Sequence, residues 1–193
     1  MEESFHTTLE AARLGAEWAW TAIYRDVAPG VLRYLRARAA AEPEDLLGGV
    51  FLEVVRALPR FTGGHSEFRA WVFTIAHHRL VDDVRWRRRR PVATTSCEDL
   101  VAAVPLGNGE DDALHPLVTK EVCRLLDHLA PDQRDVLLLR VLAGLSIVET
   151  ADVLGKRPGA VKSLQVRGLA ALRRALSSEA VSFAALPTIT EMR

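Results

Sequence analysis

The sequence predicts an all-α protein built from two small helical domains that a flexible acidic linker joins. Three observations lead to this prediction. Apolar residues recur with the period of a helix on both sides of the middle of the chain. No segment bounded by turn signals alternates apolar and polar residues as a half-buried strand would. Residues 91–116 hold prolines, glycines and acidic side chains without any apolar period.

The first domain is expected to span residues 1–90 and to be a helical bundle. Its earliest apolar segments, Trp18 to Val27 and Val31 to Leu35, look like two helices. Pro29-Gly30 lies between them, and proline interrupts a helix interior because it has no N–H to donate. We therefore expect the helix to break at this pair.

A longer amphipathic helix is predicted from Glu44 to Leu58. Pro43 precedes it, Pro59 ends it, and the carboxylates of its first turn suit the positive end of the helix dipole. Its apolar stripe follows the helical period and comprises Leu47, Val50, Phe51, Val54, Val55 and Leu58.

The next helix carries a second stripe that leads into a run of arginines. The stripe comprises Phe68, Trp71, Val72, Ile75 and Ala76, and Leu80, Val81 and Val84 continue it. Residues 85–90 then place five arginines in six positions around Trp86. Guanidinium groups pair with phosphates and aromatic rings stack on unpaired bases, so we favour a polyanionic partner for this helix. The alternative is a solvated helix end whose charges stabilise the dipole.

The charges are segregated along the chain although they sum to zero. Residues 67–90 hold seven arginines against three carboxylates, and residues 117–178 hold ten bases against six acids. Residues 91–116 hold five acids and no lysine or arginine. We interpret 91–116 as a mobile linker, followed by a second domain at 117–177 and a C-terminal tail at 178–193. The two basic blocks are candidate nucleic-acid surfaces.

The second domain is predicted to hold successive helices with a tight turn near its end. Val118, Val122, Leu125, Leu126 and Leu129 form one apolar stripe. Pro131 then begins a helix that runs through Val141. Ser146 and Glu149 make a capping box, and Gly155 ends that helix in the left-handed conformation. Pro158 opens the last helix, whose inward residues are Val161, Leu164, Gly168, Leu172 and Leu176.

The segment from Ser146 to Arg174 has the order of a helix-turn-helix. Ala151 is small enough for two helices to cross closely, and Lys162, Ser163, Gln165, Val166 and Arg167 lie outside the apolar face of the second helix. Lys162 and Arg167 suit phosphates, whereas Ser163 and Gln165 suit base edges in a major groove. An ordinary helical hairpin with a solvated basic face is the alternative.

Metal, catalytic and cofactor sites are not predicted. His77 and His78 are adjacent, so they point about 100° apart on a helix, and Cys97 and Cys123 lack partners at ligand spacing. Neither glycine pair, Gly48-Gly49 or Gly63-Gly64, forms a phosphate-binding loop. The charge-free stretch from Ala180 to Thr190, which contains Pro187, is too short to cross a membrane, and two cysteines favour an intracellular setting.

In combination, these segments resemble the bacterial RNA polymerase sigma factors of the extracytoplasmic-function type. Residues 43–61, PEDLLGGVFLEVVRALPRF, resemble the family's polymerase-binding region. Residues 68–76, FRAWVFTIA, continuing to Arg90, resemble its promoter-melting and −10-reading helix. Residues 129–140, LAPDQRDVLLLR, with 144–146, GLS, resemble the entry to region 4. Residues 160–163, AVKS, and 169–174, LAALRR, resemble the −35-reading helix.

The resemblance implies a non-catalytic, cytoplasmic subunit that binds core RNA polymerase and promoter DNA. An anti-sigma protein, which can itself lie at a membrane, is expected to hold it in check. Neither a small-molecule substrate nor direct membrane insertion is expected. The residues implied for core polymerase binding are Asp45, Leu46, Gly49 and Glu53. Those implied for −10 DNA are Gly63, Gly64, His65, Ser66, His77, His78, Arg79, Arg85 and Arg88. Those implied for −35 DNA are Arg157, Lys162, Ser163, Gln165, Val166 and Arg167.

In the family, the loop from Thr62 to Glu67 is expected to hold a base flipped out of the −10 element. Some positions depart from the family pattern. Gly48-Gly49 replaces a polar or acidic pair, which removes contact atoms for polymerase, and Thr150 occupies a position that is usually aliphatic.

Two other classes of protein stay open at this stage. A free-standing helix-turn-helix regulator would bind duplex DNA without polymerase, and it would not need the face of the helix from Glu44 to Leu58. An all-helical enzyme or metal protein is disfavoured by the lack of ligand or catalytic spacing.

Overall fold

The computed structural model describes residues 2–38, 40–89 and 124–184, and every regular element in these ranges is helical. The expectation of an all-α fold is thus met in the described ranges. The expected linker at 91–116, together with Cys97 and Cys123, lies outside the described residues.

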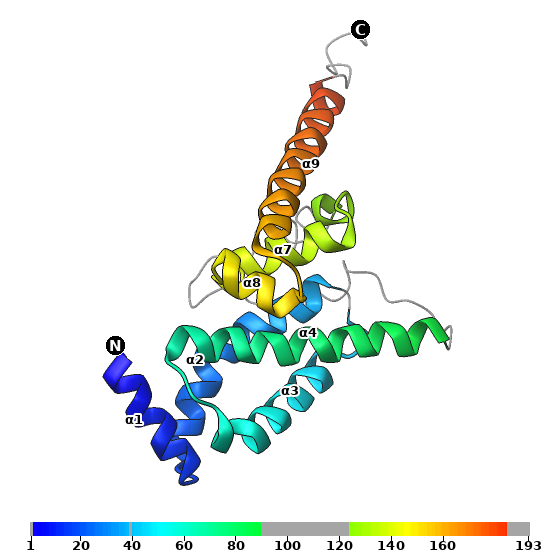
Figure 1. The fold of residues 1–193 in the computed structure, drawn as a ribbon. Helices are drawn as coiled ribbons and strands as arrows, with labels where there is room; N and C mark the ends of the chain where they lie inside the picture. The colour runs from blue at the N-terminus through cyan, green and yellow to red at the C-terminus, as the bar shows by residue number, and fades with distance from the viewer. Residues whose placement is uncertain (1, 39, 90–123, 185–193) are drawn as a thin grey trace, which may run out of the picture.

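The N-terminal part of the fold is a bundle of helices arranged around the long helix α4 (Figure 1). Its elements are α1 (Glu2–Arg13), α2 (Glu17–Ala37), α3 (Pro43–Ala57), the 3₁₀ turn η1 (Leu58–Arg60) and α4 (His65–Arg89). The stripe predicted for α3 is confirmed in most positions, because Leu47, Val50, Val54 and Leu58 are buried. Val55 is the exception, with 47% of its surface exposed.

Helix α2 runs without a break, so the prediction of two helices separated at Pro29-Gly30 is wrong. Pro29 lies inside the helix with its ring exposed, and it removes one backbone hydrogen bond. The flanking residues Ala28, Gly30 and Val31 are buried against other helices. Burial of this face outweighs the lost hydrogen bond, which costs about 3 kcal/mol in a helix interior.

The C-terminal part consists of the elements predicted for the helix-turn-helix. They are α7 (Pro131–Val141), α8 (Ile147–Leu154) and α9 (Pro158–Ala184), preceded by a helical turn at residues 124–127. Gly168 lets α9 approach α7 closely, since a Cβ there would lie 3.0 Å from Cδ1 of Leu137. The inward position predicted for Leu176 is wrong: it is 50% exposed, and Ala175 is the buried residue of that turn.

Helix α9 continues beyond the expected start of the C-terminal tail. It projects away from the rest of the fold (Figure 1) and runs to Ala184. Residues 178–184 of the expected tail are therefore helical, whereas residues 185–193 lie outside the described part.

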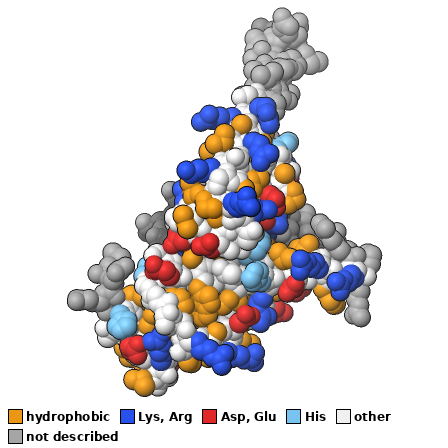
Figure 2. Space-filling model, viewed as in Figure 1, with side chains coloured by type: hydrophobic (Ala, Val, Ile, Leu, Met, Phe, Trp, Pro, Cys, Tyr) orange, Lys and Arg blue, Asp and Glu red, His pale blue; other side chains and the backbone are white. Residues whose placement is uncertain are grey.

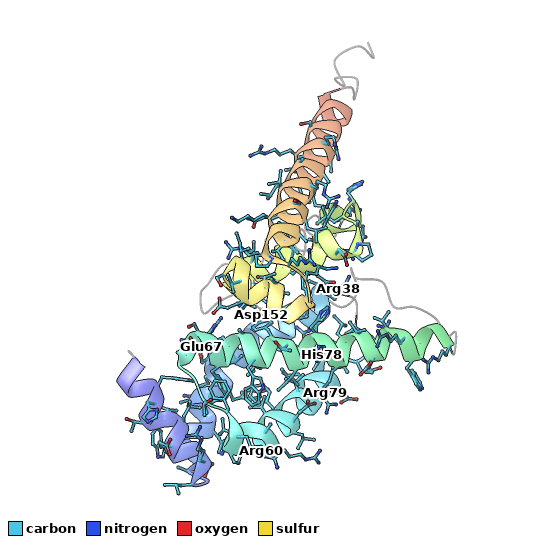
Figure 3. The ribbon with its side chains drawn as sticks, in the orientation of Figure 1. Arg38, Arg60, Glu67, His78, Arg79 and Asp152 are labelled. Carbon is cyan, nitrogen blue, oxygen red and sulfur yellow. The ribbon has the colours of Figure 1, made fainter. Side chains whose placement is uncertain are left out.

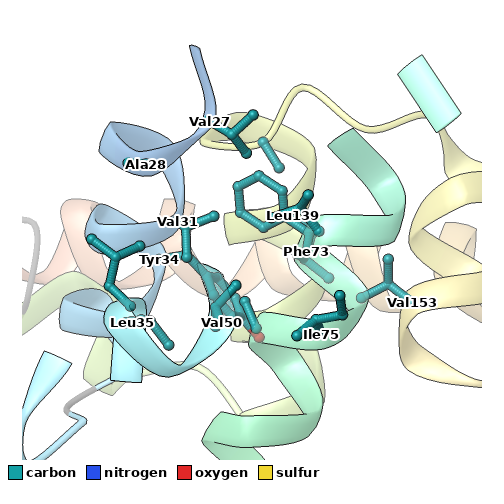
Figure 4. Packing of buried hydrophobic residues seen from close by; sticks show 14 of the residues in the cluster. Val27, Ala28, Val31, Tyr34, Leu35, Val50, Phe73, Ile75, Leu139 and Val153 are labelled. Atoms are coloured by element: carbon teal, nitrogen blue, oxygen red, sulfur yellow. The ribbon is translucent and has the colours of Figure 1, made fainter. Parts of the chain in front are cut away.

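One hydrophobic core connects the two parts of the chain. Val31 of α2 and Phe73 of α4 belong to the same buried cluster as Leu139 of α7 and Val153 of α8 (Figure 4). A smaller cluster of Val136, Ala151 and Val161 holds the helix-turn-helix itself together. The two parts therefore form a closed arrangement, in which α8 lies along α4.

Candidate nucleic-acid interface

Local features that the sequence predicts, a capping box and a left-handed glycine, fix the two ends of α8. The backbone N–H of Ser146 donates to Oε2 of Glu149 at 2.6 Å, and the N–H of Glu149 donates to Oγ of Ser146 at 3.2 Å. Gly155 takes the left-handed conformation with φ of 60°, and the next residue, Lys156, donates its N–H to the carbonyl of Ala151 at 2.8 Å. The conformation of Gly155 and the bond of Lys156 set the direction in which α9 leaves the turn.

The first turns of α9 present an open, basic face. Lys162, Ser163, Val166 and Arg167 line one shallow concave surface, and all four are exposed. The guanidinium of Arg167 donates to the carbonyl of Ser163 at 3.2 Å, which aligns it along the helix. Space-filling atoms show basic side chains recurring along α9 (Figure 2). Of the other candidates, Arg157 is exposed at the turn and Gln165 is half-buried.

The loop before α4 is held open by a glycine and a carboxylate. Gly63 has φ of 152°, and a Cβ there would lie 3.0 Å from the ring of Phe61 and 3.1 Å from Cβ of Glu67. Oε2 of Glu67 accepts the N–H of Gly64 at 3.1 Å and the hydroxyl of Ser66 at 3.2 Å. Hydrogen bonds, first to its own backbone N–H and then to Ser66 and Gly64, lower the pKa of Glu67. Gly63 and Ser66 are exposed.

His65 and Arg69 at the start of α4 share one acidic partner on α2. Nε2 of His65 lies 2.7 Å from Oδ2 of Asp26, and Nη1 of Arg69 lies 3.1 Å from Oδ1 of the same carboxylate. Nη2 of Arg69 also donates to the carbonyl of Ala143, at 3.2 Å, across to the C-terminal part.

The predicted −10 residues on α4 do not all face solvent. His78 and Arg85 are exposed, and Figure 3 shows His78 on the same stretch of α4 that faces Asp152 of α8. His77 instead points inward, with Nδ1 2.8 Å from the hydroxyl of Tyr34. Arg79 points toward α3. The side chain of Arg88 lies outside the described residues.

Two of the aromatic residues of α4 pack inside the N-terminal part of the fold, as the apolar stripe predicts for Trp71. Phe73 is completely buried, and Trp71 is half-buried with its ring stacked 5.0 Å from that of Phe61. Trp86 is 54% exposed at the far end of α4.

The residues implied for polymerase binding lie on α3. Asp45 and Glu53 are exposed, whereas Leu46 and Gly49 are half-buried. Nε of Arg79 on α4 lies 3.1 Å from Oε2 of Glu53 on α3, so this ion pair joins α3 to α4. A Cβ on Gly49 would lie 2.7 Å from Nη1 of Arg79. The glycine therefore makes room for the arginine.

A buried polar cluster joins α2, α4 and α7, and the sequence analysis missed it. Oδ1 of Asp135 accepts the hydroxyl of Tyr34 at 3.2 Å and lies 2.6 Å from Nε of Arg38. Burial first, and then the nearby Asp135, raise the pKa of Tyr34, and burial lowers the pKa of His77. The signal in the sequence was a carboxylate at position 135, directly before the apolar run of residues 136–139.

Two negative findings apply to the described ranges alone. Within residues 2–38, 40–89 and 124–184, no group of three or more His, Cys, Asp and Glu side chains is placed to hold a metal ion. In the same ranges, no helix is both long and apolar enough to cross a membrane.

Comparison with known proteins identifies the family. Residues 23–90 match the family model Sigma-70 region 2, and residues 120–172 match Sigma-70, region 4. The ECF RNA polymerase sigma factor ShbA of Streptomyces griseus is 37% identical over 161 residues, which cover 76% of this chain and 82% of ShbA. The ECF RNA polymerase sigma factor BldN of Streptomyces coelicolor is 35% identical over 174 residues, covering 89% of this chain and 66% of BldN.

A solved structure shares the fold. The sigma factor RpoE from Bartonella quintana, in its co-crystal with the anti-sigma factor NepR, superposes with a TM-score of 0.66 at 23% identity. The match covers 82% of this chain and 96% of RpoE. From the two region matches and these relatives, we conclude that the chain belongs to the ECF family of RNA polymerase sigma factors.

Proposed function

We propose that this protein binds core RNA polymerase and directs it to promoters by reading a −35 and a −10 element. The observation that carries the proposal is the open basic face on the first turns of α9, in a helix-turn-helix that belongs to Sigma-70 region 4. The protein itself supplies binding and strand opening, and it has no catalytic centre of its own. It acts in the cytoplasm, where the polymerase and the chromosome are.

The −35 element is read in the major groove by α9. Lys162 and Arg167 neutralise phosphates, which provides affinity that falls as salt rises. Ser163 and Gln165 hydrogen-bond to base edges, and exposed Val166 contacts a thymine methyl group. Arg157 at the turn contacts the backbone of the duplex.

The −10 element is opened and held by the loop before α4. Gly63, Gly64, His65 and Ser66 surround a base that has left the duplex, while His78 and Arg85 contact the strand along α4. Unstacking a base costs a few kcal/mol, so the protein must supply compensating contacts at the loop. Arg79 contributes by fixing α4 to α3 through Glu53.

Core polymerase is bound by the outer face of α3. Asp45 and the half-buried Leu46 combine charge with apolar surface, as an interface core requires. Gly49 and Glu53 continue this face one and two turns further along the helix.

Promoter binding requires the closed arrangement to open. Elements centred at −35 and −10 are separated by about 25 base pairs, or roughly 85 Å of duplex. In the closed arrangement, α8 lies directly on α4, and a groove between them is lined by His78, Arg85 and Asp152. The two reading surfaces therefore have to separate before both elements are bound at once.

An anti-sigma protein holds this sigma factor in its inactive state. The solved structures that share the fold include a sigma factor with an anti-sigma factor bound, RpoE with NepR. The closed arrangement suits such control, because a partner that bridges α4 and α8 would keep the reading surfaces together. Such a partner can also hold the protein at a membrane.

Run-off transcription with purified core polymerase tests the proposal. A library of promoter fragments randomised over the −35 and −10 positions should yield discrete transcripts only when the protein is added. A free-standing helix-turn-helix regulator would instead bind duplex DNA and leave core polymerase unbound in a pull-down without DNA. Absence of both transcripts and core binding would overturn the proposal.

A further inference from the structure

One buried carboxylate of the C-terminal part is held by donors that all belong to the N-terminal part. Oδ1 of Asp135, on α7, lies 2.6 Å from Nε of Arg38 and accepts the hydroxyl of Tyr34 at 3.2 Å. Both donors lie at the C-terminal end of α2, and His77 of α4 contacts the hydroxyl of Tyr34. We call Tyr34, Arg38 and His77 the α2 anion site.

The donors of the α2 anion site form a chain that ends on the anion. The hydroxyl of Tyr34 lies 2.8 Å from Nδ1 of His77. This hydroxyl has a single proton, which it donates to Asp135, so its oxygen accepts a hydrogen bond from Nδ1–H of His77. His77 therefore orients the hydroxyl toward whichever anion occupies the site.

Asp135 leaves one donor of the site unused. Among the residues that the structure describes, the buried Nε of Arg38 has no acceptor in hydrogen-bonding geometry, although the carboxylate of Asp135 lies close to it. Buried donors are rarely left unpaired in folded proteins. A DNA phosphate carries one negative charge, as a carboxylate does, and guanidinium groups pair with phosphates through two parallel hydrogen bonds. The unused donor therefore suits a phosphate as the ligand.

The separation of charge across the closed arrangement favours the same ligand. Asp152 of α8 lines the groove between α4 and α8 together with His78 and Arg85 of α4. Asp82 of α4 also lines this groove, where it lies 3.4 Å from Arg85. When the two parts separate, Asp135 and Asp152 leave with the C-terminal part. The face that stays behind is richer in positive charge and attracts a polyanion.

The α2 anion site adjoins the stretch of α4 that is proposed to contact the −10 strand. The ring centroids of His77 and His78 are 6.3 Å apart, and His78 is exposed. A strand that contacts His78 therefore passes close to His77 and to the hydroxyl bonded to it. This continuity favours a phosphate of that strand over the acidic side chain of another protein.

We propose that Arg38 and Tyr34 bind a backbone phosphate of the −10 strand in the open protein, and that Asp135 occupies the same site in the closed one. The inference rests on the proposed function, because it adds a phosphate contact to the strand that the N-terminal part holds. Asp135 is then an internal substitute for DNA, which fills the site while the molecule is closed. His77 is a positioning residue, since it acts through Tyr34.

The test uses holoenzyme assembled with core polymerase and a promoter selected in the run-off assay. Uncharged methylphosphonate groups replace the phosphates of the −10 region one at a time, and the positions at which affinity falls form the phosphate profile. Wild-type holoenzyme should lose affinity about tenfold at each contacted phosphate, because a hydrogen bond to a charged group is lost. Arg38→Met should weaken binding to the unmodified promoter by about the same factor. In that variant, one position of the profile should cause no further loss, since the two changes remove one interaction.

Two other variants separate phosphate binding from a role in closure alone. In holoenzyme, Asp135→Asn should bind the promoter as wild type does, because Asp135 has already left the site. In the free protein, the same change should raise the affinity for a single-stranded −10 oligonucleotide severalfold. Tyr34→Phe keeps the buried ring and removes the donor, so it should weaken holoenzyme binding a few-fold through the same phosphate as Arg38→Met. Arg25→Met, an exposed change on the same helix, is the matched control and should behave as wild type.

The outcomes distinguish this inference from the proposed function. No promoter-specific transcript with wild-type protein would end both together. Normal transcription with an unchanged phosphate profile in Arg38→Met would overturn the inference alone. Loss of core binding in a pull-down, with DNA contacts intact, would assign Arg38 to an acidic protein partner and would also overturn it. If Arg38→Met does not fold, the phosphate profile of Tyr34→Phe decides by the same criterion.

Discussion

At the scale of single residues, Gly49 shows how a position can be misread from the sequence. Beside Gly48 it indicates lost contact atoms on the helix proposed to bind polymerase. In the structure it also makes space for the guanidinium of Arg79, which pairs with Glu53. The contact joins helices that are distant in the chain, so no local pattern predicts it.

The two glycines form a matched pair for a stability measurement. A Cβ at position 48 would meet nothing within 4 Å, so Gly48→Ala should raise the free energy of unfolding by about 0.5–1 kcal/mol through helix propensity alone. Gly49→Ala should raise it by less, because Arg79 must move and its pairing with Glu53 is lost. Urea unfolding measures both variants. Equal gains would show that Arg79 relaxes at no cost.

The exposed basic side chains of α9 lead to a second prediction at the scale of single residues. Lys162→Ala and Arg167→Ala should each weaken binding to a −35 duplex and reduce the slope of log K against log salt by about 0.9, since each removes one phosphate contact. A fluorescence titration at several salt concentrations measures the slope. Arg25→Ala, an exposed change on α2, is the control. Wild-type slopes in both α9 variants would mean that another element enters the groove.

At the scale of elements, local signals predicted the ends of helices well and their interiors less well. The capping box at Ser146, the left-handed Gly155 and the start of α9 at Pro158 are confirmed. These features depend on hydrogen bonds within a few residues, so the sequence contains them. Pro29 was misread because tertiary burial of α2, which the local sequence does not encode, keeps the helix continuous.

The candidate site residues also divide into those that a local pattern predicts and those that depend on tertiary packing. The basic face of α9 follows from helical period, and the structure exposes most of it. Three contact residues, Asp26, Arg13 and Asp135, were not singled out from the sequence. Each makes a hydrogen bond or ion pair with a residue 39 or more positions away in the chain. Their roles appear only once the helices are packed.

The capping box can be tested as part of the reading surface. Ser146→Ala removes the acceptor for the N–H of Glu149, and it should lower the free energy of unfolding by about 1 kcal/mol. Binding to the −35 duplex should weaken by less than the Lys162→Ala change, because the contacts themselves stay in place. Thermal unfolding with a parallel titration measures both. Unchanged stability would mean that water replaces the cap.

At the scale of the whole molecule, one buried polar cluster depends on the closed arrangement. Its members are Tyr34, Arg38, His77 and Asp135, and it forms where α2 and α4 meet α7. Asp135 is the counter-charge of Arg38, and both are largely buried where α2 meets α7. Separation of the two parts would expose both groups to water. The cluster therefore favours closure only while every partner is in place.

Asp135→Asn should open the molecule. The change leaves the Arg38 guanidinium in a buried position without its carboxylate, an arrangement that costs about 3–5 kcal/mol when one partner of a buried pair is removed. Small-angle X-ray scattering of the full chain should report a larger radius of gyration than for wild type. Asp132→Asn, which removes only the more exposed pairing with Lys156, is the control. An unchanged radius would show that apolar contacts alone keep the parts together.

Lowering the pH should also favour opening of the closed arrangement. His77 faces Tyr34 and Arg38 from α2 and Asp135 from α7, with His78 beside it and Lys156 beyond, and burial holds its pKa below the usual 6.5. The closed arrangement keeps His77 neutral, so its stability is complete above about pH 6.5 and declines as pH falls through that value and on to the lowered pKa. His77→Gln should remove this dependence. Scattering measured between pH 5 and 8 tests it.

Arg13 fastens α1 to the chain before α4, because its guanidinium donates to the carbonyls of Leu58 and Phe61. This fastening has a practical consequence for anyone who expresses a fragment of the protein. A fragment cut at residue 23, where the region 2 match begins, would discard Leu9 and Ala12, both nearly inaccessible in the intact fold, and would strip the opening turns of α2. Such a fragment would present bare apolar surface beside the loop at residues 62–67, so an expression boundary upstream of α1 is the one that preserves the native packing of the region 2 helices.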